Sequence, residues 1–264
     1  MIPLLVLVVR ASEKSRYAPL ELTDRPQDLR HQTGIELSKD GILHQMFAMD
    51  NDKTQADPIS APEAQPEGVI ISPDTRRANR IPPGQSRTRK WPILDAGGPP
   101  RVDIEKWELK LWGLVNEPIR WSWKEFEALP RVRVFSDFHC VTRWSRLGNL
   151  WEGVPVSELV RRAGGVKPEA SHVLAHGYDH GWTTNMPLAE FLAEDVLVAT
   201  THDGQPLTLE HGGPARLIVP RLYAWKSAKW LGGIEFLHRD QAGFWERNGY
   251  HMNGDPWREE RHNW

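Results

Sequence analysis

Residues 136–145 read SDFHCVTRWS and contain Cys140, the only cysteine of this 264-residue chain. A single cysteine forms no internal disulfide and cannot build a zinc or iron–sulfur site that needs several thiolates. It can supply one soft thiolate to a metal whose other sulfur ligands come from a cofactor. Cys140 follows a polar run, and the neighbouring His139 and Arg143 favour its thiolate form. From the residues alone, Cys140 is either a metal ligand or a small buried hydrophobic residue.

A second group of motifs lies far downstream. Residues 211–220 read HGGPARLIVP, and residues 223–230 read YAWKSAKW. Arg216 offers phosphate oxygens a planar, bidentate donor, and the lysines offer point charges. Gly212 and Gly213 let backbone N–H groups approach an anion closely. From the residues alone, the segment is either an anion site or a solvated basic surface.

Together with WEGVP at residues 151–155, these motifs resemble the sulfite-oxidase-type molybdopterin oxidoreductases, over roughly residues 80–264. The resemblance implies an α+β fold of mixed, β-rich sheets with short helices. It also implies a molybdenum ion held by two dithiolene sulfurs of a pyranopterin, the thiolate of Cys140, and oxo or water ligands. It further indicates a bacterial member with a single catalytic domain.

The resemblance also implies where the cofactor binds. The expected contacts are His211, Arg216, Ser227, Ala228 and Lys229, with His176 and Gly177 in the loop 175–185 and Arg89 and Trp91 in the segment 81–94. Trp182 stands where many relatives have tyrosine, which argues against a proton-donor role at that position. The tail at residues 243–251 is expected to serve packing rather than chemistry.

The catalytic prediction centres on Cys140, with His139, Arg143 and Arg146 as candidates for lining a pocket for an anionic or polar substrate. The expected reaction is two-electron oxygen-atom transfer on a small oxo donor or acceptor, such as sulfite or a sulfoxide, with a separate electron-transfer partner. Two alternatives stay open. One is a non-catalytic domain that binds or carries molybdopterin. The other is a pterin-free zinc or copper site formed by Cys140 with His139, His176 or His180.

Local sequence patterns predict the secondary-structure elements. Alternation predicts a strand at 107–111, and a capping box of Ser122 and Glu125 predicts a short helix to Leu129. Further predictions are a strand from 132 that delivers Cys140, helices at 157–163 and 187–194, strands at 172–175, 217–219 and 234–237, and a hairpin at 196–209. No βαβ rhythm is present, so one main α+β domain is expected.

Composition limits the possibilities for domain organisation, binding partners and location. Residues 1–79 are expected to be an N-terminal extension, largely a disordered linker, because they are polar and proline-rich, and residues 80–264 form the oxidoreductase domain. A net charge of −2 gives no general attraction to nucleic acid, and no apolar run approaches the ~20 residues that span a membrane. One cysteine rules out a CxxCH haem attachment in this chain. Without a clear export signal, a cytoplasmic location is expected.

Overall fold

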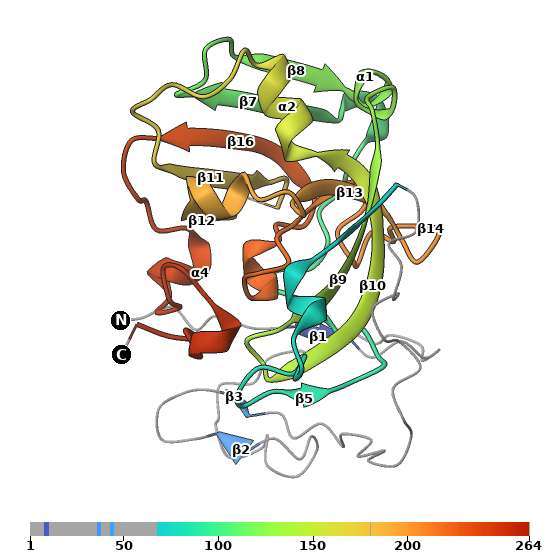
Figure 1. The fold of residues 1–264 in the computed structure, drawn as a ribbon, viewed down its shortest axis with the longest axis vertical. Helices are drawn as coiled ribbons and strands as arrows, with labels where there is room; N and C mark the ends of the chain where they lie inside the picture. The colour runs from blue at the N-terminus through green and yellow to red at the C-terminus, as the bar shows by residue number, and fades with distance from the viewer. Residues whose placement is uncertain (1–7, 11–35, 38–42, 45–67, 180, 264) are drawn as a thin grey trace, which may run out of the picture. The chain divides into compact units, whose positions relative to one another are not determined.

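The computed structural model describes residues 8–10, 36–37, 43–44, 68–179 and 181–263. The chain forms two compact units, residues 11–56 and the remainder. In the smaller unit, strands β2 (Glu36–Leu37) and β3 (Leu43–His44) pair antiparallel. The larger unit is built mainly from two sheets (Figure 1).

The first sheet has seven strands, centred on a long antiparallel pair. Strands β9 (Val132–His139) and β10 (Trp144–Pro155) run side by side in Figure 1. The path continues as β14-β13-β10-β9-β4, with β15 on β13 and β5 on β10. The bounds of these strands are β4 Val69–Ile71, β5 Ser86–Arg87, β13 Leu197–His202, β14 Gln205–Pro206 and β15 Arg216–Ile218.

The second sheet has five strands in the order β12-β11-β16-β7-β8. Their bounds are β7 Glu108–Gly113, β8 Ile119–Ser122, β11 His172–Gly177, β12 Thr183–Pro187 and β16 Leu231–Leu237. A further pair joins β1 (Val8–Arg10) to β6 (Ile93–Asp95). The α+β prediction is confirmed: the sheets are mixed and β-rich, and the helices are short.

Local signals explain several elements. Leu109 and Leu111 of β7 are buried while Lys110 is exposed, as the alternation predicts. The capping box of Ser122 and Glu125 opens α1 (Trp123–Glu127). The remaining helices are α2 Val156–Arg162, α3 Leu188–Phe191 and α4 Phe244–Arg247, with 3₁₀ turns at Pro73–Arg76, Ile104–Lys106, Ala224–Lys226 and Pro256–Arg258.

Helix α2 ends as its glycines predict. Gly164 and Gly165 have φ of 69° and 94°, in the left-handed region. Their N–H groups donate to the carbonyls of Arg161 and Val160, the two bonds of a Schellman motif. Glycine therefore stops this helix where a residue with a side chain would be strained.

Two predicted element boundaries differ from the structure, and one strand lies before the predicted domain. Helix α3 makes one turn instead of spanning 187–194, because Ala193 N–H bonds the carbonyl of Glu190 in a tighter, 3₁₀-type turn. In the hairpin, the second strand is β14 and not residues 207–209. The chain leaves the strand pairing after Leu207 N–H donates to the carbonyl of Thr200. Strand β4 pairs with β9 inside the main sheet, so ordered structure begins before residue 80.

The boundary at residue 79 remains a prediction for the chain as a whole, but the packing of residues 69–76 favours an earlier one. Ser72 Oγ donates to the carboxylate of Asp195 over 2.6 Å, and both residues are buried. Thr75 is also buried and bonds the carbonyl of Ser72. This turn therefore belongs to the core of the larger unit.

Two apolar clusters form the interior of the larger unit. The larger cluster joins both sheets, with Leu111, Phe236 and Val173 from one and Val154 and Val198 from the other. The smaller cluster is rich in aromatic rings and holds Phe138, Trp144, Trp151 and Cys140. The site described next opens beside this second cluster.

Candidate active site

Cys140 lies at the turn between the two longest strands. Its N–H donates to the carbonyl of Trp144, and its own carbonyl accepts from the N–H of Arg143, which closes a tight turn. Arg143 sits at φ 72°, in the left-handed region that such a turn requires. The turn leaves Cys140 only 7% exposed, with its side chain at the wall of a cleft.

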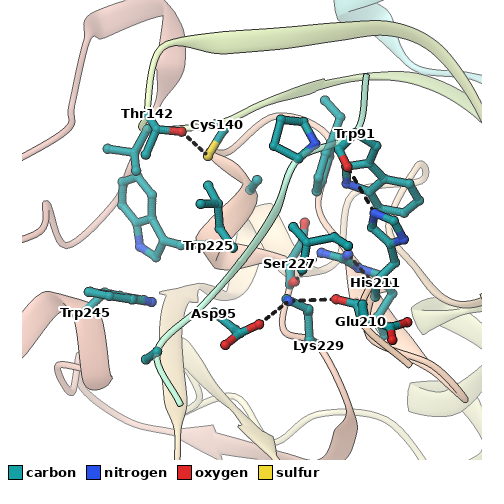
Figure 2. A pocket seen from close by; sticks show the side chains of 18 of the residues that line it. Trp91, Asp95, Cys140, Thr142, Glu210, His211, Trp225, Ser227, Lys229 and Trp245 are labelled. Carbon is teal, nitrogen blue, oxygen red and sulfur yellow. Dashed lines mark hydrogen bonds and ion pairs between the residues drawn. The ribbon is translucent and has the colours of Figure 1, made fainter. Parts of the chain in front are cut away.

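The cleft has a cavity volume of about 120 Å³ and is open to solvent. Five segments that are distant in sequence line it: residues 91–96, 138–144, 210–216, 224–230 and the C-terminal segment with Trp245 and Tyr250. Asp179 and Trp182 complete the wall. Figure 2 shows Cys140, Thr142, Trp225 and Trp245 at one end, and Trp91, His211 and Lys229 at the other.

Thr142 is the hydrogen-bonding neighbour of the cysteine. Its Oγ1 donates to Cys140 Sγ over 3.2 Å. Burial raises the pKa of the Cys140 thiol, and the bond from Thr142 opposes that rise. The site therefore holds a thiol when the cleft carries no positive centre, and a bound metal cation would favour the thiolate.

Arg216 defines the other end of the cleft. Its side chain is 3% exposed, and two of its nitrogens donate to the carbonyls of His211 and Ser227. Its Nε is buried with no hydrogen-bond partner, and no carboxylate of the described residues pairs with it. Burial lowers the pKa of Arg216 to about 9. A buried cation without a counter-charge is the expected state of a site built for an anion.

Lys229 adds a second cation at this end. Its Nζ donates to the carbonyl of Glu210 and lies 3.9 Å from Asp95 Oδ2. Burial and the charge of Arg216 lower its pKa to about 8. Lys229 therefore remains largely protonated at neutral pH and adds positive potential beside Arg216.

Trp91 and His211 form the far wall. Their rings stack with centroids 3.9 Å apart, and His211 Nε2 lies 3.2 Å from the carbonyl of Trp91. Burial lowers the pKa of His211, and the charges of Arg216 and Lys229 lower it further. The ring is therefore neutral near pH 7, where it offers one donor and one acceptor.

Ser227 lines the cleft as predicted, whereas several other sequence-predicted residues lie outside it. His139 points into the protein, where its Nδ1 lies 2.8 Å from Ser145 Oγ. Neighbouring residues on a strand face opposite sides, so His139 and Cys140 diverge. Burial lowers the pKa of His139 to about 4, which makes it neutral. Arg143 is exposed outside the cleft, and Arg146 pairs with Asp203.

Four predicted cofactor contacts also fall outside the lining. His176 pairs with Glu235 and packs on Trp112 in the second sheet. Gly177 stands behind the cleft, where a Cβ would collide with the carboxylate of Asp179. Arg89 is exposed. Ala228 is buried, and its carbonyl accepts a hydrogen bond from Leu217 N–H.

Sequence reasoning missed several lining residues, notably Thr142, Asp95, Asp179, Trp225 and Tyr250. For Asp179, burial raises the pKa to about 7. The polar loop 175–185 was a signal for this residue, although the prediction named its histidine and glycine instead. Nothing local marks the C-terminal aromatic residues, because only the fold brings them to the cleft.

The residues present fit a molybdenum–pyranopterin group. Cys140 Sγ and the cation pair of Arg216 and Lys229 line the same cleft, and Arg216 Nε has no partner there. A pterin-free zinc or copper site has no such support. Among the residues that the structure describes, no three His, Cys, Asp or Glu side chains converge as metal ligands. His180, which the zinc or copper alternative also named, lies outside the described residues.

Comparison with known proteins identifies the class. Residues 96–245, more than half of the chain, match the oxidoreductase molybdopterin binding domain. The chain belongs to this sulfite-oxidase-like family of molybdopterin oxidoreductases and is an oxidoreductase, as the resemblance predicted.

Individual relatives add detail. The chain is 50% identical over 189 residues to the uncharacterized oxidoreductase YuiH of Bacillus subtilis (strain 168), which covers 71% of this chain and 94% of YuiH. It is 29% identical over 153 residues to YedZ1 of Azospira oryzae, a putative protein-methionine-sulfoxide reductase subunit, over 58% of this chain and 57% of YedZ1.

A solved structure supports the fold. The sulfane dehydrogenase SoxCD from Paracoccus pantotrophus superposes with a TM-score of 0.51 at 21% identity, over 71% of this chain and 50% of that chain. The chain thus spans only about half of the SoxCD chain. None of the helices in the described ranges is long and apolar enough to cross a membrane.

Proposed function

We propose that this chain catalyses two-electron oxygen-atom transfer on a small substrate, such as sulfite or a sulfoxide, with Cys140 as the protein ligand to molybdenum. The observation that supports this proposal best is the single cleft shared by a buried thiol and a buried arginine without a counter-charge. When bound, the molybdenum–pyranopterin group supplies the two-electron redox chemistry. The chain supplies binding, orientation and electrostatics.

Arg216, Lys229, Ser227 and His211 would hold the phosphate of the cofactor. Arg216 offers its unpartnered Nε, and Lys229 adds charge at the same end. Ser227 Oγ accepts a hydrogen bond from Val219 N–H, which leaves its own O–H free to donate. The dianion of a phosphate monoester would neutralise this pair of cations, which makes binding favourable inside the cleft.

Cys140 would fix the metal at the opposite end. The tight turn holds its backbone, and Thr142 orients the sulfur through the bond to Sγ. Trp225, Trp245 and Tyr250 form an aromatic wall beside it. This wall limits access of water to the reacting centre.

The balance of the reaction requires an electron partner. Sulfite and water give sulfate with release of two electrons and two protons, and a sulfoxide takes up two electrons and two protons to give a sulfide and water. We propose a separate one-electron carrier as that partner, and a cytoplasmic location, which a single unpaired cysteine suits. Fractionation of the producing cell tests the location.

The test is the molybdenum and pterin content of protein made in a host that synthesises the cofactor. We expect about one molybdenum and one oxidisable pterin per chain in the wild-type protein. Cys140→Ala should lose the metal or change its spectrum, while Thr142→Ser, which keeps the hydroxyl, should retain both. Turnover is then assayed as sulfite oxidation by ferricyanide and sulfoxide reduction by reduced viologen.

Other results would redirect the assignment. Full pterin content without dependence on Cys140, and without turnover, would favour a carrier domain. Folded protein that lacks both pterin and molybdenum would refute the proposed function.

A further inference from the structure

Arg261 lies directly behind the turn that carries Cys140. It comes from the C-terminal segment, and its side chain is only 8% exposed. Nη1 donates to the carbonyl of Val141 over 2.9 Å, and Nη2 donates to the carbonyl of Pro83 over 3.2 Å. One guanidinium therefore joins the C-terminal segment, the turn after Cys140 and the segment around Pro83.

The backbone of Arg261 is fixed as well as its side chain. Its N–H donates to the carbonyl of Glu259, and its own carbonyl accepts from the N–H of His251. The next residue, His262, pairs with Tyr250 in an isolated antiparallel bridge. The guanidinium is thus held from both ends, so its position behind the turn is well defined.

The charge of Arg261 is only partly compensated. Its Nε is buried without a hydrogen-bond partner. Among the described residues it forms an ion pair with Glu259 alone, over 3.7 Å, and that carboxylate is half in solvent, which screens the pair. Arg143 adds a second cation, because a Cβ on Gly84 would lie 3.2 Å from a nitrogen of each arginine. The net charge of this group is therefore positive.

This charge acts on the sulfur of Cys140. Burial raises the pKa of the Cys140 thiol, and the charge of Arg261 is one of the effects that oppose the rise. A cation beside a thiolate ligand also reduces the electron density that the sulfur donates to its metal. Net charge and hydrogen bonds around a metal centre are among the features by which a protein sets a reduction potential.

Gln85 holds the same turn without a charge. Its Nε2 donates to the carbonyl of Cys140 over 3.0 Å, one residue before the carbonyl that Arg261 holds. Two consecutive carbonyls of the turn thus accept hydrogen bonds from side chains of distant segments, one neutral and one cationic. The chain therefore offers its own comparison between a structural contact and a charged one.

We propose that Arg261 is a positioning residue that sets the reduction potential of the molybdenum bound at Cys140, by holding a buried positive charge behind the thiolate. This inference rests on the proposed function and adds to it a residue outside the cleft lining. A positive charge stabilises the reduced, more negative form of the centre, so its removal should lower the potential.

The test is the midpoint potential of the one-electron couple of molybdenum in purified holoenzyme, followed by EPR during a redox titration. Arg261→Met removes the charge and keeps much of the side-chain volume. It should lower the one-electron equilibrium constant by about 3- to 10-fold, and tenfold corresponds to about 59 mV. Arg261→Lys keeps the charge without the planar fork, so its potential should stay closer to that of the wild type.

Gln85→Met is the matched control. It removes a hydrogen bond to the turn but no charge, so the potential should not change. Glu259→Gln removes the opposing negative charge and should raise the potential, the opposite sign to Arg261→Met. This second variant leaves the two carbonyl contacts of Arg261 in place, so it decides the question if Arg261→Met does not fold.

Three results would overturn the role of Arg261: an unchanged potential in Arg261→Met, an equal fall in Gln85→Met, or no rise in Glu259→Gln. Molybdenum and pterin contents are measured on every preparation. Folded wild-type protein without molybdenum would refute the proposed function. Loaded protein whose potential does not respond to Arg261→Met would refute this inference alone.

Discussion

Thr142 Oγ1 donates a hydrogen bond of 3.2 Å to Cys140 Sγ, within the turn that joins β9 to β10. The bond stabilises the thiolate against the penalty of burial. The same turn thus places the sulfur in the cleft and adjusts its protonation.

Thr142→Val should raise the pKa of Cys140 further, because it removes that bond and keeps the side-chain shape. We expect alkylation of the cofactor-free protein by iodoacetamide to slow by about 3- to 10-fold at neutral pH. The pH profile of the alkylation rate measures the effect. Thr142→Ser restores the hydroxyl and should behave like the wild type; an unchanged rate in Thr142→Val would argue against the bond.

Arg216→Met tests the anion end without the cofactor. Inorganic phosphate should raise the Tm of the cofactor-free wild-type protein, and saturation at one hundred times Kd corresponds to about 2.7 kcal/mol. The variant should lose this response, since it lacks the buried guanidinium. Arg120→Met, which changes an exposed arginine, should keep it.

The same variant should fold about as stably as the wild type in the absence of phosphate. Its two lost hydrogen bonds, about 1 kcal/mol each, are offset by removal of a buried charge. Urea unfolding measures this difference. A loss of several kcal/mol would indicate a structural role for Arg216 instead of a binding role.

Asp179 should make stability depend on pH. Burial raises its folded-state pKa to about 7, from an ordinary value near 3.8, so the folded protein binds more protons between these values. Stability contributed by this group therefore falls as pH rises from about 4 to about 7. Asp179→Asn should remove that fall, so its Tm advantage over the wild type should grow across this range and then stay constant. Parallel Tm curves would contradict the prediction.

Lys226 and Glu246 form a buried ion pair that anchors the C-terminal segment. Their charged atoms lie 2.6 Å apart, and both side chains are fully buried. Lys226→Met leaves the carboxylate without its cation, and we expect a loss of about 3–5 kcal/mol in urea unfolding. Lys226→Met combined with Glu246→Gln should recover part of the loss, because the uncompensated charge is gone.

The exposed Lys106 provides the comparison. Its ion pair with Asp103 is mostly in solvent, so Lys106→Met should change stability by less than about 1 kcal/mol. Equal effects of Lys226→Met and Lys106→Met would show that burial does not govern the contribution of these pairs.

Local rules predicted the elements whose signals lie within a few residues. The alternation at 107–111, the capping box of Ser122 and Glu125, and the stop at Gly164 each follow from short-range geometry, and the structure confirms them. Strand β4 was missed because three residues carry little pattern. Its place in the sheet depends on pairing with β9, more than sixty residues later.

The site residues divide in the same way, into those that local motifs predicted and those that only the fold reveals. The sequence motifs predicted Cys140, His211, Arg216 and Lys229 as site residues, because their chemistry is recognisable in residue type and spacing. Sequence proximity to Cys140 was a poor guide for His139 and Arg143. Strand alternation turns the first inward, and the tight turn leaves the second exposed outside the cleft.

The sequence by itself determined the chemical class of this protein: one thiol, a basic glycine-containing segment, and strands to carry them. The tertiary structure alone decided that the thiol and the unpaired arginine share one cleft, and that Tyr250 from the C-terminal segment lines it. The physical reason is that a binding site depends on distances between side chains from separate segments. Those distances are set by long-range strand pairing and the buried anchor of Lys226, which no local pattern encodes.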